Sequence, residues 1–481
     1  MIRSTSPAFA PLADSTTQPL YRQLYERVLA AIANGALKPG DRLPSARALA
    51  KDLGVARGTV ELAYSLLISE GYLLSRGQAG TAVNPDLQTL PVASRSAANA
   101  PAPQEDAPDA LWRPSHLLPF QMGVPALDAF PRKIWARLGA RYMRGMRLGD
   151  LDYPAPHGLP QLRSAIASYL QVARGIDCGA HQVFVTSGWR NSLAFVAHAL
   201  LQAGERVWVE DPGFPPTRQI LRQFGVALAP VAVDSEGMDI ERGITQANDA
   251  KAVLVTPGHQ SPLSMALSLP RRQLLLDWAA RQNAWVVEDD YDGEYRYISR
   301  PLPALASLDR NGRVLYAGTF SKVLFPGIRL AYLVVPQAQV ATFERVGRTL
   351  FAAGSPSMTQ ALVAEFIAEG HFTRHIQRMR RLYNERRAAT IAALERSLPA
   401  QLRVEPSPGG MHLVLRLPPA VNDIALAEHL LSKGFSVQAL SRWAASAPGE
   451  SGLLLGFTNC TNPAQAEQVG NLIRLAVEGH G

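Results

Sequence analysis

The chain has 481 residues, of which 47% are hydrophobic and 18% are charged, an ordinary balance for a globular protein. This length exceeds what one core supports and predicts about two to four domains. No run of about 18 apolar residues occurs, so we expect no membrane span, and the first residues lack the pattern of a signal peptide. The two cysteines, Cys178 and Cys460, argue against a disulfide framework and a metal site and fit a reducing cytoplasm.

The formal net charge is +8 and the sequence pI is about 9.6. This mild excess of basic residues suits a polyanionic partner such as nucleic acid. Charge alone fits plain solvation of the surface equally well, so any binding function has to come from local patterns.

Residues 15–83 predict a compact unit of helices followed by a hairpin. Apolar residues at helical spacing predict a helix from Leu20 to Asn34 that ends at Gly35. Ser45 is a good N-cap for a second helix over residues 46–53, and a third helix is expected over residues 57–70.

Residues 72–83 contain Gly77 and Gly80 and predict a hairpin after the third helix. The order helix, turn, helix and hairpin is typical of a winged helix-turn-helix, whose third helix enters the major groove of DNA. A helical bundle with solvated surface arginines is the alternative interpretation.

Five residues of this unit are candidate DNA contacts. Arg57 and Thr59 stand at the N-terminal end of the third helix, where side chains reach base edges. Arg42 and Arg47 are placed to hold phosphates, and Gly77 lets the hairpin approach the DNA backbone closely.

Two phrases of this unit resemble the GntR family of regulators. They are Leu-Pro-Ser-Ala-Arg-Ala-Leu-Ala over residues 43–50 and Gly-Val-Ala-Arg-Gly-Thr-Val over residues 54–60. The resemblance implies that Arg47, Arg57 and Thr59 contact DNA. Ala56 departs from the serine cap often found there, and a lost cap costs roughly 1 kcal/mol.

Residues 84–115 are rich in proline, alanine and serine and cannot bury enough apolar surface to fold, so they predict a flexible linker. From residue 117 onward, short apolar runs alternate with helical patterns. Apolar strands between helices predict a largely parallel sheet covered on both faces, with ligands beyond the carboxyl ends of its strands. The predicted strands begin at Val183, Arg206, Ala252, Ala284 and Val314.

Lys322 lies in the segment Thr-Phe-Ser-Lys-Val-Leu-Phe-Pro-Gly-Ile-Arg, which runs from Thr319 to Arg329. A lysine amine forms a Schiff base with an aldehyde, and Thr319, Ser321 and Arg329 can hold a phosphate. This combination is the chemistry of pyridoxal 5'-phosphate, so we predict that the cofactor forms an aldimine with Lys322.

The pyridine nitrogen of such a cofactor needs a carboxylate to stay protonated. An apolar strand ends in acids at residues 288–290, and Asp289 is the chosen partner. Glu288 and Asp290 are the competing choices. Tyr291 can donate a hydrogen bond to the phenolic oxygen of the ring.

A phosphate also binds at the start of a helix, where backbone N–H groups point outward. Ser187, Gly188 and Trp189 follow a predicted strand and open a helix, and are candidates for this phosphate cup. Phe214 follows the next predicted strand and can stack on the pyridine ring.

These motifs occur in the order of the fold-type I aminotransferases, which residues 116–481 resemble. With the GntR-like head, the whole chain resembles the MocR subfamily of GntR regulators. The resemblance implies an α/β fold with a large subdomain over about residues 150–335 and a small subdomain in the remainder. It also implies a homodimer in which Tyr153 reaches the phosphate bound by the partner subunit.

Two positions depart from a working aminotransferase. Leu454 occupies the place where such enzymes carry an arginine that binds the substrate carboxylate bidentately. Arg190, Arg218 or Arg442 are substitutes to consider. The second departure is the segment at residues 256–262, where the enzymes carry an asparagine for the ring oxygen, and where His259 or Ser261 would take over that role.

The sequence therefore predicts a cytoplasmic, DNA-binding transcriptional regulator that senses an amine, an amino acid or pyridoxal phosphate through the aldimine at Lys322. A dimer would read a double-stranded operator with two half-sites. A genuine aminotransferase with an accessory DNA-binding head is one alternative, and an aminotransferase-like half-reaction stays open. A plain repressor with a relic cofactor site is the other.

Overall fold

A computed structural model describes residues 18–77, 80–87, 117–297, 303–350, 355–445 and 450–479. The chain divides into two compact units, Met1–Pro114 and Ser115–Gly481. Most of the predicted linker, residues 88–115, lies outside the described residues, as do residues 15–17 of the predicted N-terminal domain. Each unit is described by itself.

The N-terminal unit contains the elements that the sequence predicts. They are the helices α1 (Leu20–Ala33), α2 (Ala46–Leu53) and α3 (Arg57–Ser69), followed by the antiparallel strands β1 (Leu73–Ser75) and β2 (Thr81–Val83). The helices pack around a core to which α3 contributes Val60, Tyr64 and Leu67. This is the winged helix-turn-helix arrangement.

The ends of α2 and α3 follow from single residues. The Ser45 hydroxyl accepts a hydrogen bond from the Ala48 N–H at 3.2 Å, and Gly54 ends α2 in the left-handed conformation. Ala56 precedes α3 and has no side chain to cap it. The second helix is therefore capped at both ends, while the third begins on an uncapped residue.

Residues 84–87, the first residues of the predicted linker, contact the N-terminal unit. The Asn84 N–H donates to the Tyr72 carbonyl at 2.9 Å, and Leu87 packs against the core of the N-terminal unit. An apolar side chain beyond Pro85 thus still finds a partly buried surface.

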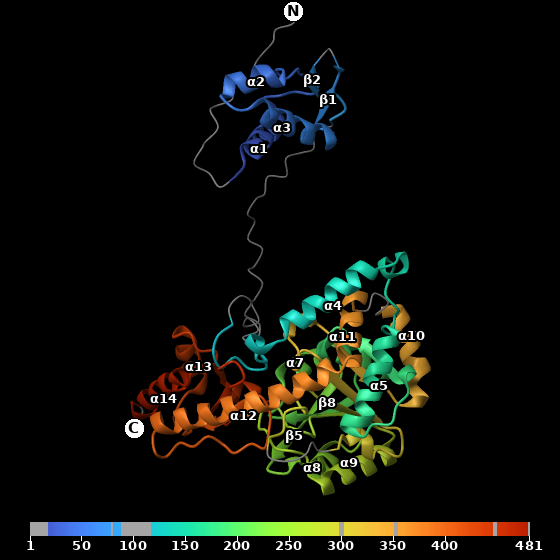
Figure 1. Ribbon diagram of the computed structural model, residues 1–481, viewed down its shortest axis with the longest axis vertical. Helices are drawn as coiled ribbons and strands as arrows, with labels where there is room; N and C mark the ends of the chain where they lie inside the picture. Colours follow the sequence, from blue (N-terminus) through green and yellow to red (C-terminus); the bar gives the residue numbers. More distant parts are fainter. Residues whose placement is uncertain are drawn as a thin grey trace, which may run out of the picture. The chain divides into compact units, whose positions relative to one another are not determined.

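The C-terminal unit is built on a mixed sheet with helices on both faces (Figure 1). Within the described residues, the sheet has eight strands in the order β3-β10-β9-β8-β7-β4-β5-β6. The strands β5, β4, β7, β8 and β9 are parallel neighbours, and β10 runs antiparallel to both β9 and β3. The strands are β3 (Val183–Thr186), β4 (Arg206–Asp211), β5 (Ala227–Asp234), β6 (Gly237–Met238), β7 (Ala252–Val255), β8 (Trp285–Asp290), β9 (Val314–Thr319) and β10 (Ala331–Val334).

Successive residues of the buried strands point to opposite faces of this sheet, so each face has its own core. One face packs against α6 (Trp189–Leu200), α7 (Pro215–Gln223) and α10 (Val340–Leu350). The other packs against a larger set of helices. This set comprises α4 (Arg132–Gly145), α5 (Pro160–Arg174), α8 (Ile240–Ala247), α9 (Leu269–Gln282) and α11 (Ser357–Ala368).

A smaller sheet and its helices form the rest of this unit. The sheet consists of β11 (His412–Arg416), β13 (Gly452–Gly456) and β12 (Gln438–Ala439), in that order. The long helix α12 (His371–Ser397) runs from the large sheet to this smaller part (Figure 1), where α13 (Asp423–Ser432) and α14 (Pro463–Glu478) complete the layer.

Residues 117–126 belong to the smaller part although they precede the large sheet in sequence. The Gly456 N–H donates to the Phe120 carbonyl at 2.9 Å, and the Ser436 N–H donates to the Pro119 carbonyl at 2.9 Å. The Phe120 side chain is fully buried in the core of the smaller part. The first described segment after the linker is thus anchored on the small sheet.

The predicted subdomain boundary near residue 335 falls before two helices that pack with the large part. Helix α10 packs on the large sheet, and α11 packs on α4 and α5. Within α12, the core of the smaller part begins at Met379, and this core also includes Phe120, Ala126, Ala129 and Tyr295 from earlier in the chain. The sequence pattern did not reveal this because neither the amphipathic α10 nor the largely apolar α11 shows which part of the protein it packs against.

None of the described helices combines the length and the apolar composition that a membrane crossing requires.

The core position of Leu67 gives a direct test of the N-terminal fold. Leu67 is fully buried on α3, whereas Leu62 on the same helix is 47% exposed. We expect Leu67→Ala to lower the free energy of unfolding of this unit by about 2–5 kcal/mol, because truncation leaves a cavity. Leu62→Ala should change it by less than about 0.5 kcal/mol. Hydrogen exchange of the α3 amides in the full chain measures both, and equal effects would contradict the placement of α3.

Candidate functional site

The predicted cofactor residues gather beyond the carboxyl ends of neighbouring strands. Ser187 follows β3, Phe214 lies three residues beyond β4, Asp289 lies at the end of β8, and Lys322 lies three residues beyond β9. Parallel strands bring these ends to one edge of the sheet, which is where ligands bind in such folds. The topology therefore brings together residues that are up to 135 positions apart, from 187 to 322.

The Lys322 amine is held by a backbone carbonyl. Its Nζ donates a hydrogen bond to the Gly123 oxygen at 2.9 Å, and a Cβ atom on Gly123 would lie 2.3 Å from that nitrogen. Burial lowers the pKa of Lys322, and the nearby Asp289 and Asp292 carboxylates oppose this effect in part. A lysine with a lowered pKa is more often neutral and therefore nucleophilic.

A second group of residues forms a cradle at the start of α6. Gly188 has a φ of 108°, and a Cβ atom there would lie 3.3 Å from the Arg329 guanidinium. The Ser187 N–H donates to Asn191 Oδ1 at 3.0 Å, and the Ser187 hydroxyl lies 3.2 Å from that of Ser355. Hydroxyls, a guanidinium and a helix start together suit a phosphate.

The remaining members of the predicted phosphate group lie in the same turn. The Thr319 hydroxyl accepts a hydrogen bond from the Ser321 N–H at 3.1 Å, which fixes the start of the Lys322 segment. Arg329 ends this segment with a φ of 48° in the left-handed region. That turn directs the chain from the lysine back into β10.

The three acids that end β8 have different partners. Glu288 is buried and accepts hydrogen bonds from the Leu305 and Ala306 N–H groups, both at 2.8 Å. Asp290 accepts from Arg174 Nε at 2.7 Å. Asp289 instead lines the pocket, and burial raises its pKa well above the usual value. The geometry supports Asp289 over its two neighbours as the partner of a ring nitrogen.

A buried ion network stands behind this strand end. The Arg174 guanidinium contacts Asp290 at 2.7 Å and Glu294 at 3.1 Å, and the Tyr316 hydroxyl donates to Asp290 at 2.6 Å. The Tyr169 hydroxyl donates to Glu294 at 2.9 Å. The paired acids hold the turn that follows β8 and leave Asp289 directed toward the pocket.

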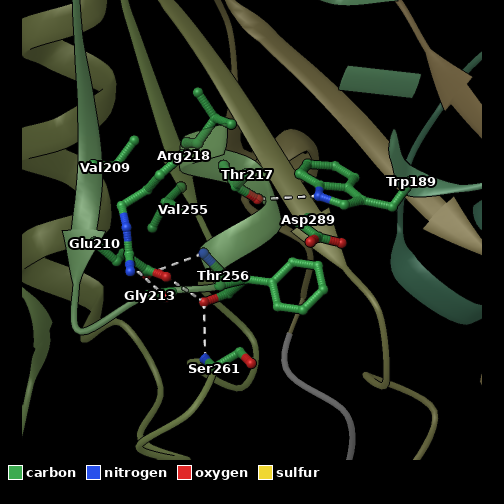
Figure 2. Close-up of a pocket in the computed structure, with 12 residues that line it drawn as sticks. Trp189, Val209, Glu210, Gly213, Thr217, Arg218, Val255, Thr256, Ser261 and Asp289 are labelled. Carbon is green, nitrogen blue, oxygen red and sulfur yellow. Dashed lines mark hydrogen bonds between the residues drawn. The ribbon is translucent and has the colours of Figure 1, made fainter. Parts of the chain in front are cut away.

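The pocket has an aromatic side and a polar side. Figure 2 shows the Trp189 indole near the Asp289 carboxylate, with Glu210 and Thr256 across the pocket. Trp189 Nε1 donates to the Thr217 hydroxyl at 3.1 Å, which fixes the indole. The Phe214 ring also lines this pocket and lies 5.7 Å from that of Trp443. The pocket therefore offers flat apolar surface beside an acid.

Tyr291 points to His259 rather than to a free site. Its hydroxyl lies 3.0 Å from His259 Nδ1, and burial raises the pKa of Tyr291 well above its usual value. Both residues are buried or half-buried near the acids of β8. His259 therefore occupies a place next to the predicted ring-oxygen donor, as one of the two sequence-based choices anticipates. The other choice, Ser261, also contacts Tyr291 through a side-chain hydrogen bond, and its N–H donates to the Thr256 hydroxyl at 3.2 Å.

The position expected for a carboxylate clamp is apolar. Leu454 is fully buried on β13. Of the substitutes considered, Arg218 donates to the carbonyls of Gly213 and Trp443, both at 2.7 Å, and Arg442 pairs with Glu428 at 2.7 Å. The apolar neighbours of Leu454 are Leu263, Val414, Leu440, Trp443, Met122 and Phe214.

Tyr153 stands apart from the other predicted residues within this chain. Its side chain is 88% exposed, as are those of nearby Leu148 (88%) and Leu151 (69%). The exposed tyrosine therefore contributes to no site that a single chain completes.

The candidate DNA contacts of the N-terminal unit are all on its surface. Arg42, Arg47, Arg57 and Gly77 are exposed, and Thr59 is half-buried near the start of α3. Arg57 Nε contacts Glu61 one turn later at 2.7 Å. Any contact of Arg57 with a base has to replace this exposed ion pair, which contributes little.

Sequence reasoning missed Gly123, Asn191 and Ser355. Gly123 acts through its carbonyl, which every residue type carries, so no residue pattern marks it. Asn191 and Ser355 contact Ser187 from one turn along α6 and from the start of α11. Only Asn191 had a usable signal, since a polar residue in the first turn of a helix often completes an anion site.

These residues fit pyridoxal phosphate on chemical grounds. An anion would fit the cradle at Gly188, next to the Arg329 guanidinium. Burial lowers the pKa of the Lys322 amine and makes it more nucleophilic. The Asp289 carboxyl, with its raised pKa, gains a stabilising partner when a protonated pyridine lies beside it.

Comparisons with known proteins agree with this description. Residues 126–449 match the aminotransferase class I and II family, and residues 20–83 match the gntR family of bacterial regulatory proteins. The chain is 37% identical to the probable rhizopine catabolism regulatory protein MocR of Rhizobium meliloti, over 96% of this chain and 95% of that protein. It is 35% identical to the pyridoxine biosynthesis transcriptional regulator PdxR of Corynebacterium glutamicum, over 90% of this chain and 91% of that protein.

Among solved structures, the alpha-aminoadipate aminotransferase LysN of Thermus thermophilus, complexed with N-(5'-phosphopyridoxyl)-L-leucine, is 27% identical to the chain. It aligns with a TM-score of 0.68 over 76% of this chain and 92% of that one. Together with the family matches, this similarity confirms the predicted fold class.

Glu210 gives a pH-dependent test of the pocket. Its carboxyl accepts hydrogen bonds from the Thr256 hydroxyl at 2.6 Å and from Gln260 Nε2 at 3.2 Å, yet burial raises its pKa to about 7. Because the folded carboxyl binds its proton more tightly than the unfolded one, stability falls as the pH rises from about 4.5 to about 7. Glu210→Gln should remove this loss, which is at most about 3 kcal/mol.

The measurement is the thermal midpoint of wild type and Glu210→Gln at pH 5 and pH 8. We expect the variant to gain on the wild type between the two pH values, whereas exposed Glu385→Gln should follow the wild type. An identical pH dependence in wild type and Glu210→Gln would show that Glu210 is ionised in the folded protein throughout.

Proposed function

The chain belongs to the MocR subfamily of GntR transcriptional regulators, whose C-terminal part has the fold of the pyridoxal-phosphate-dependent aminotransferases, and we propose that it senses an amine, an amino acid or pyridoxal phosphate through Lys322. The observation that carries this proposal is the placement of the Lys322 amine. It lies at the sheet edge that also carries Asp289 and the Gly188 cradle, and burial lowers its pKa.

Each residue has a role in holding the cofactor. Ser187, Gly188 and the N–H of Trp189 bind the phosphate at the start of α6, with Thr319, Ser321 and Arg329 on its other side. Asp289 holds the proton of the pyridine nitrogen, Phe214 packs on the ring, and Tyr291 donates to the ring oxygen. When bound, pyridoxal phosphate supplies an aldehyde carbon that amines attack. Lys322 links the cofactor covalently through Nζ.

An effector amine would compete with Lys322 for the aldehyde that the cofactor supplies. A free Lys322 Nζ donates its hydrogen bond to the Gly123 carbonyl, so contact with residues 117–126 would depend on whether this amine is free. This segment directly follows the linker in sequence. We infer that effector binding biases the arrangement of the DNA-reading heads through this segment.

The proposed active form is a homodimer in the cytoplasm that binds double-stranded DNA with two half-sites. Leu148, Leu151 and Tyr153 form a group of exposed large side chains close together in sequence. A second copy of the chain that covers this group would place Tyr153 at the phosphate of the partner subunit, as the resemblance implies.

A genuine aminotransferase with an accessory head is the second candidate function, favoured by the similarity to LysN over most of that enzyme. Against dedicated catalysis stands Leu454, which is buried where a substrate carboxylate would need an arginine. Multiple turnover of an amino acid with a keto acid would establish the enzyme, and a single half-reaction would not.

Lys322→Ala tests the cofactor proposal. We expect purified wild-type protein incubated with pyridoxal phosphate to show visible absorbance and, after borohydride reduction, a covalent adduct on Lys322. The variant should show no adduct at this position and bind the cofactor at least about tenfold more weakly. Exposed Lys433→Ala is the matched control. A colourless wild type without an adduct would end the proposal.

Two arginines test the DNA-binding head. On a DNA fragment identified by footprinting near the protein's own gene, Arg47→Ala should weaken binding to all sequences and reduce the slope of log K against log salt by about 0.9. Arg57→Ala should lower discrimination between the site and its single-base variants by about 1–3 kcal/mol. Exposed Arg22→Ala on α1 is the control. Fluorescence anisotropy at several salt concentrations measures all three variants. Unchanged slopes would show that the DNA interface lies elsewhere.

A further inference from the structure

Helix α4 carries charge of one sign only. Its 14 residues include five basic side chains and no acid, and all five are exposed. Three of them, Lys133, Arg137 and Arg141, follow one another at a spacing of four residues and therefore form a row along one side of the helix. Leu138 packs into the core on another side of α4, so the row faces outward.

A second row of basic side chains lies on α12, where the structure divides the arginines of residues 371–387 into two groups. One group donates to acceptors on neighbouring segments and comprises Arg380, Arg386 and Arg387. The other group is exposed, with spacings of four and three residues that place its members in one row, and comprises Arg374, Arg378 and Arg381. No acid occurs from His371 to Asn384.

The two rows meet at His371, the first residue of α12. The Arg137 guanidinium lies 3.4 Å from His371 Nε2, and the Arg374 guanidinium lies 2.9 Å from His371 Nδ1. Arg374 also donates to the Glu369 carbonyl at 2.8 Å, which fixes the arginine at the start of the helix. The row on α4 therefore continues into the row on α12.

Two acids lie at this junction and do not cancel its charge. Glu365 and Glu369, at the end of α11, both contact Arg141, and Glu369 also lies 3.2 Å from His371. Glu385, one turn beyond the second row, ends it. We call the two rows together the basic band, which consists of Lys133, Arg137, Arg141, Arg374, Arg378 and Arg381. Six cations and two anions leave this surface a formal charge of +4.

The dimensions and composition of the band fit duplex DNA. At 1.5 Å per residue, each row is about 10–12 Å long. DNA presents a phosphate for roughly every 3.4 Å of each strand, so one row spans about three base pairs. Thr373 and Gln377 are exposed beside the arginines and can also donate to phosphates. The stretch 371–384 exposes no phenylalanine, tyrosine or tryptophan on which the bases of a single strand would stack.

We propose that the basic band is a second DNA-binding surface, which contacts the phosphates of duplex DNA flanking the bases that the N-terminal unit reads. The inference rests on the proposed function, since it takes the operator DNA as the polyanion. Contacts to phosphates add affinity without adding sequence preference. Arg378 and Arg381 carry most of the effect, because neither side chain has a hydrogen-bonded or ion-paired partner in the part of the chain that the structure describes.

The test compares the salt dependence of DNA binding by the full-length protein on two fragments. The short fragment is the segment that Arg378→Gln/Arg381→Gln protein still protects in footprinting, and the long fragment adds its natural flanks. We expect the wild type to bind the long fragment more tightly and with a steeper slope of log K against log salt. The double variant should lower the slope on the long fragment by about 1.8 for each chain, about 0.9 per lost phosphate contact, and leave the short fragment unchanged.

Arg242→Gln/Arg281→Gln is the matched control for this measurement. It removes the same charge from exposed positions on α8 and α9, which lie at the opposite end of the C-terminal unit from α4 (Figure 1). Both of its slopes should equal those of the wild type, because a phosphate contact and not the net charge of the protein sets the slope.

A cleavage reagent attached to the band locates the DNA independently of affinity. Gln377→Cys, labelled with an iron chelate, carries the reagent between the arginines of α12 in a Cys178→Ser chain whose remaining thiol, Cys460, is buried. We expect cleavage within the flanking DNA of the long fragment. The same reagent on Arg281→Cys should cleave none of it.

The inference is overturned if Arg378→Gln/Arg381→Gln keeps the wild-type slope on the long fragment, or if the reagent at residue 377 cleaves no flanking DNA. An equal fall of the slope on both fragments would also overturn it, because the contacts would then lie outside the flanks. A wild type that binds neither fragment would contradict the proposed function instead.

Discussion

The hydrogen bond between the Lys322 amine and the Gly123 carbonyl joins two separately built parts of the C-terminal unit. Lys322 follows β9 of the large sheet, whereas Gly123 belongs to a segment anchored on the small sheet through Phe120. The site exists only where these two parts meet. Any ligand that binds the Lys322 amine has to compete with the Gly123 carbonyl. A reaction at this one nitrogen therefore alters a contact between the large part and the small part.

Several acids lie near the Lys322 amine, and two of them are stabilised by pairing with an arginine. Asp290 and Glu294 lie in a largely buried environment, where an unpaired carboxylate would be costly, and Arg174 contacts both. Asp289, at the end of β8, stays outside this network. Its carboxylate is repelled by other acids, and it is attracted by Lys322. A cationic pyridine ring would therefore find there a carboxyl that needs a counter-charge.

The sequence predicted the elements that have local signals, such as α2 between Ser45 and Gly54, and the site residues that follow apolar strands. It did not predict Gly123, because a carbonyl contact across 199 residues leaves no mark on residue type. It also did not place α10 and α11, since the apolar surface of a helix shows that it is buried but not against what. In sequence, Glu288, Asp289 and Asp290 are competing choices for one role, and the different partners of this acidic run emerge only when Arg174 and His259 are packed beside it.

The arrangement around Lys322 favours reversible capture of an amine over turnover. A nucleophilic lysine and a phosphate cradle are sufficient to hold an aldehyde cofactor and to exchange amines on it. Efficient transamination further requires that the substrate be fixed by its carboxylate, since precise orientation accounts for much of the rate of such a step. Here Leu454 is buried in an apolar cluster against which Phe214 packs, and Arg218 donates to the backbone carbonyls of Gly213 and Trp443. The proposed cofactor residues are thus present, while the position that would orient an amino acid is part of an apolar core, a division that would suit a sensor.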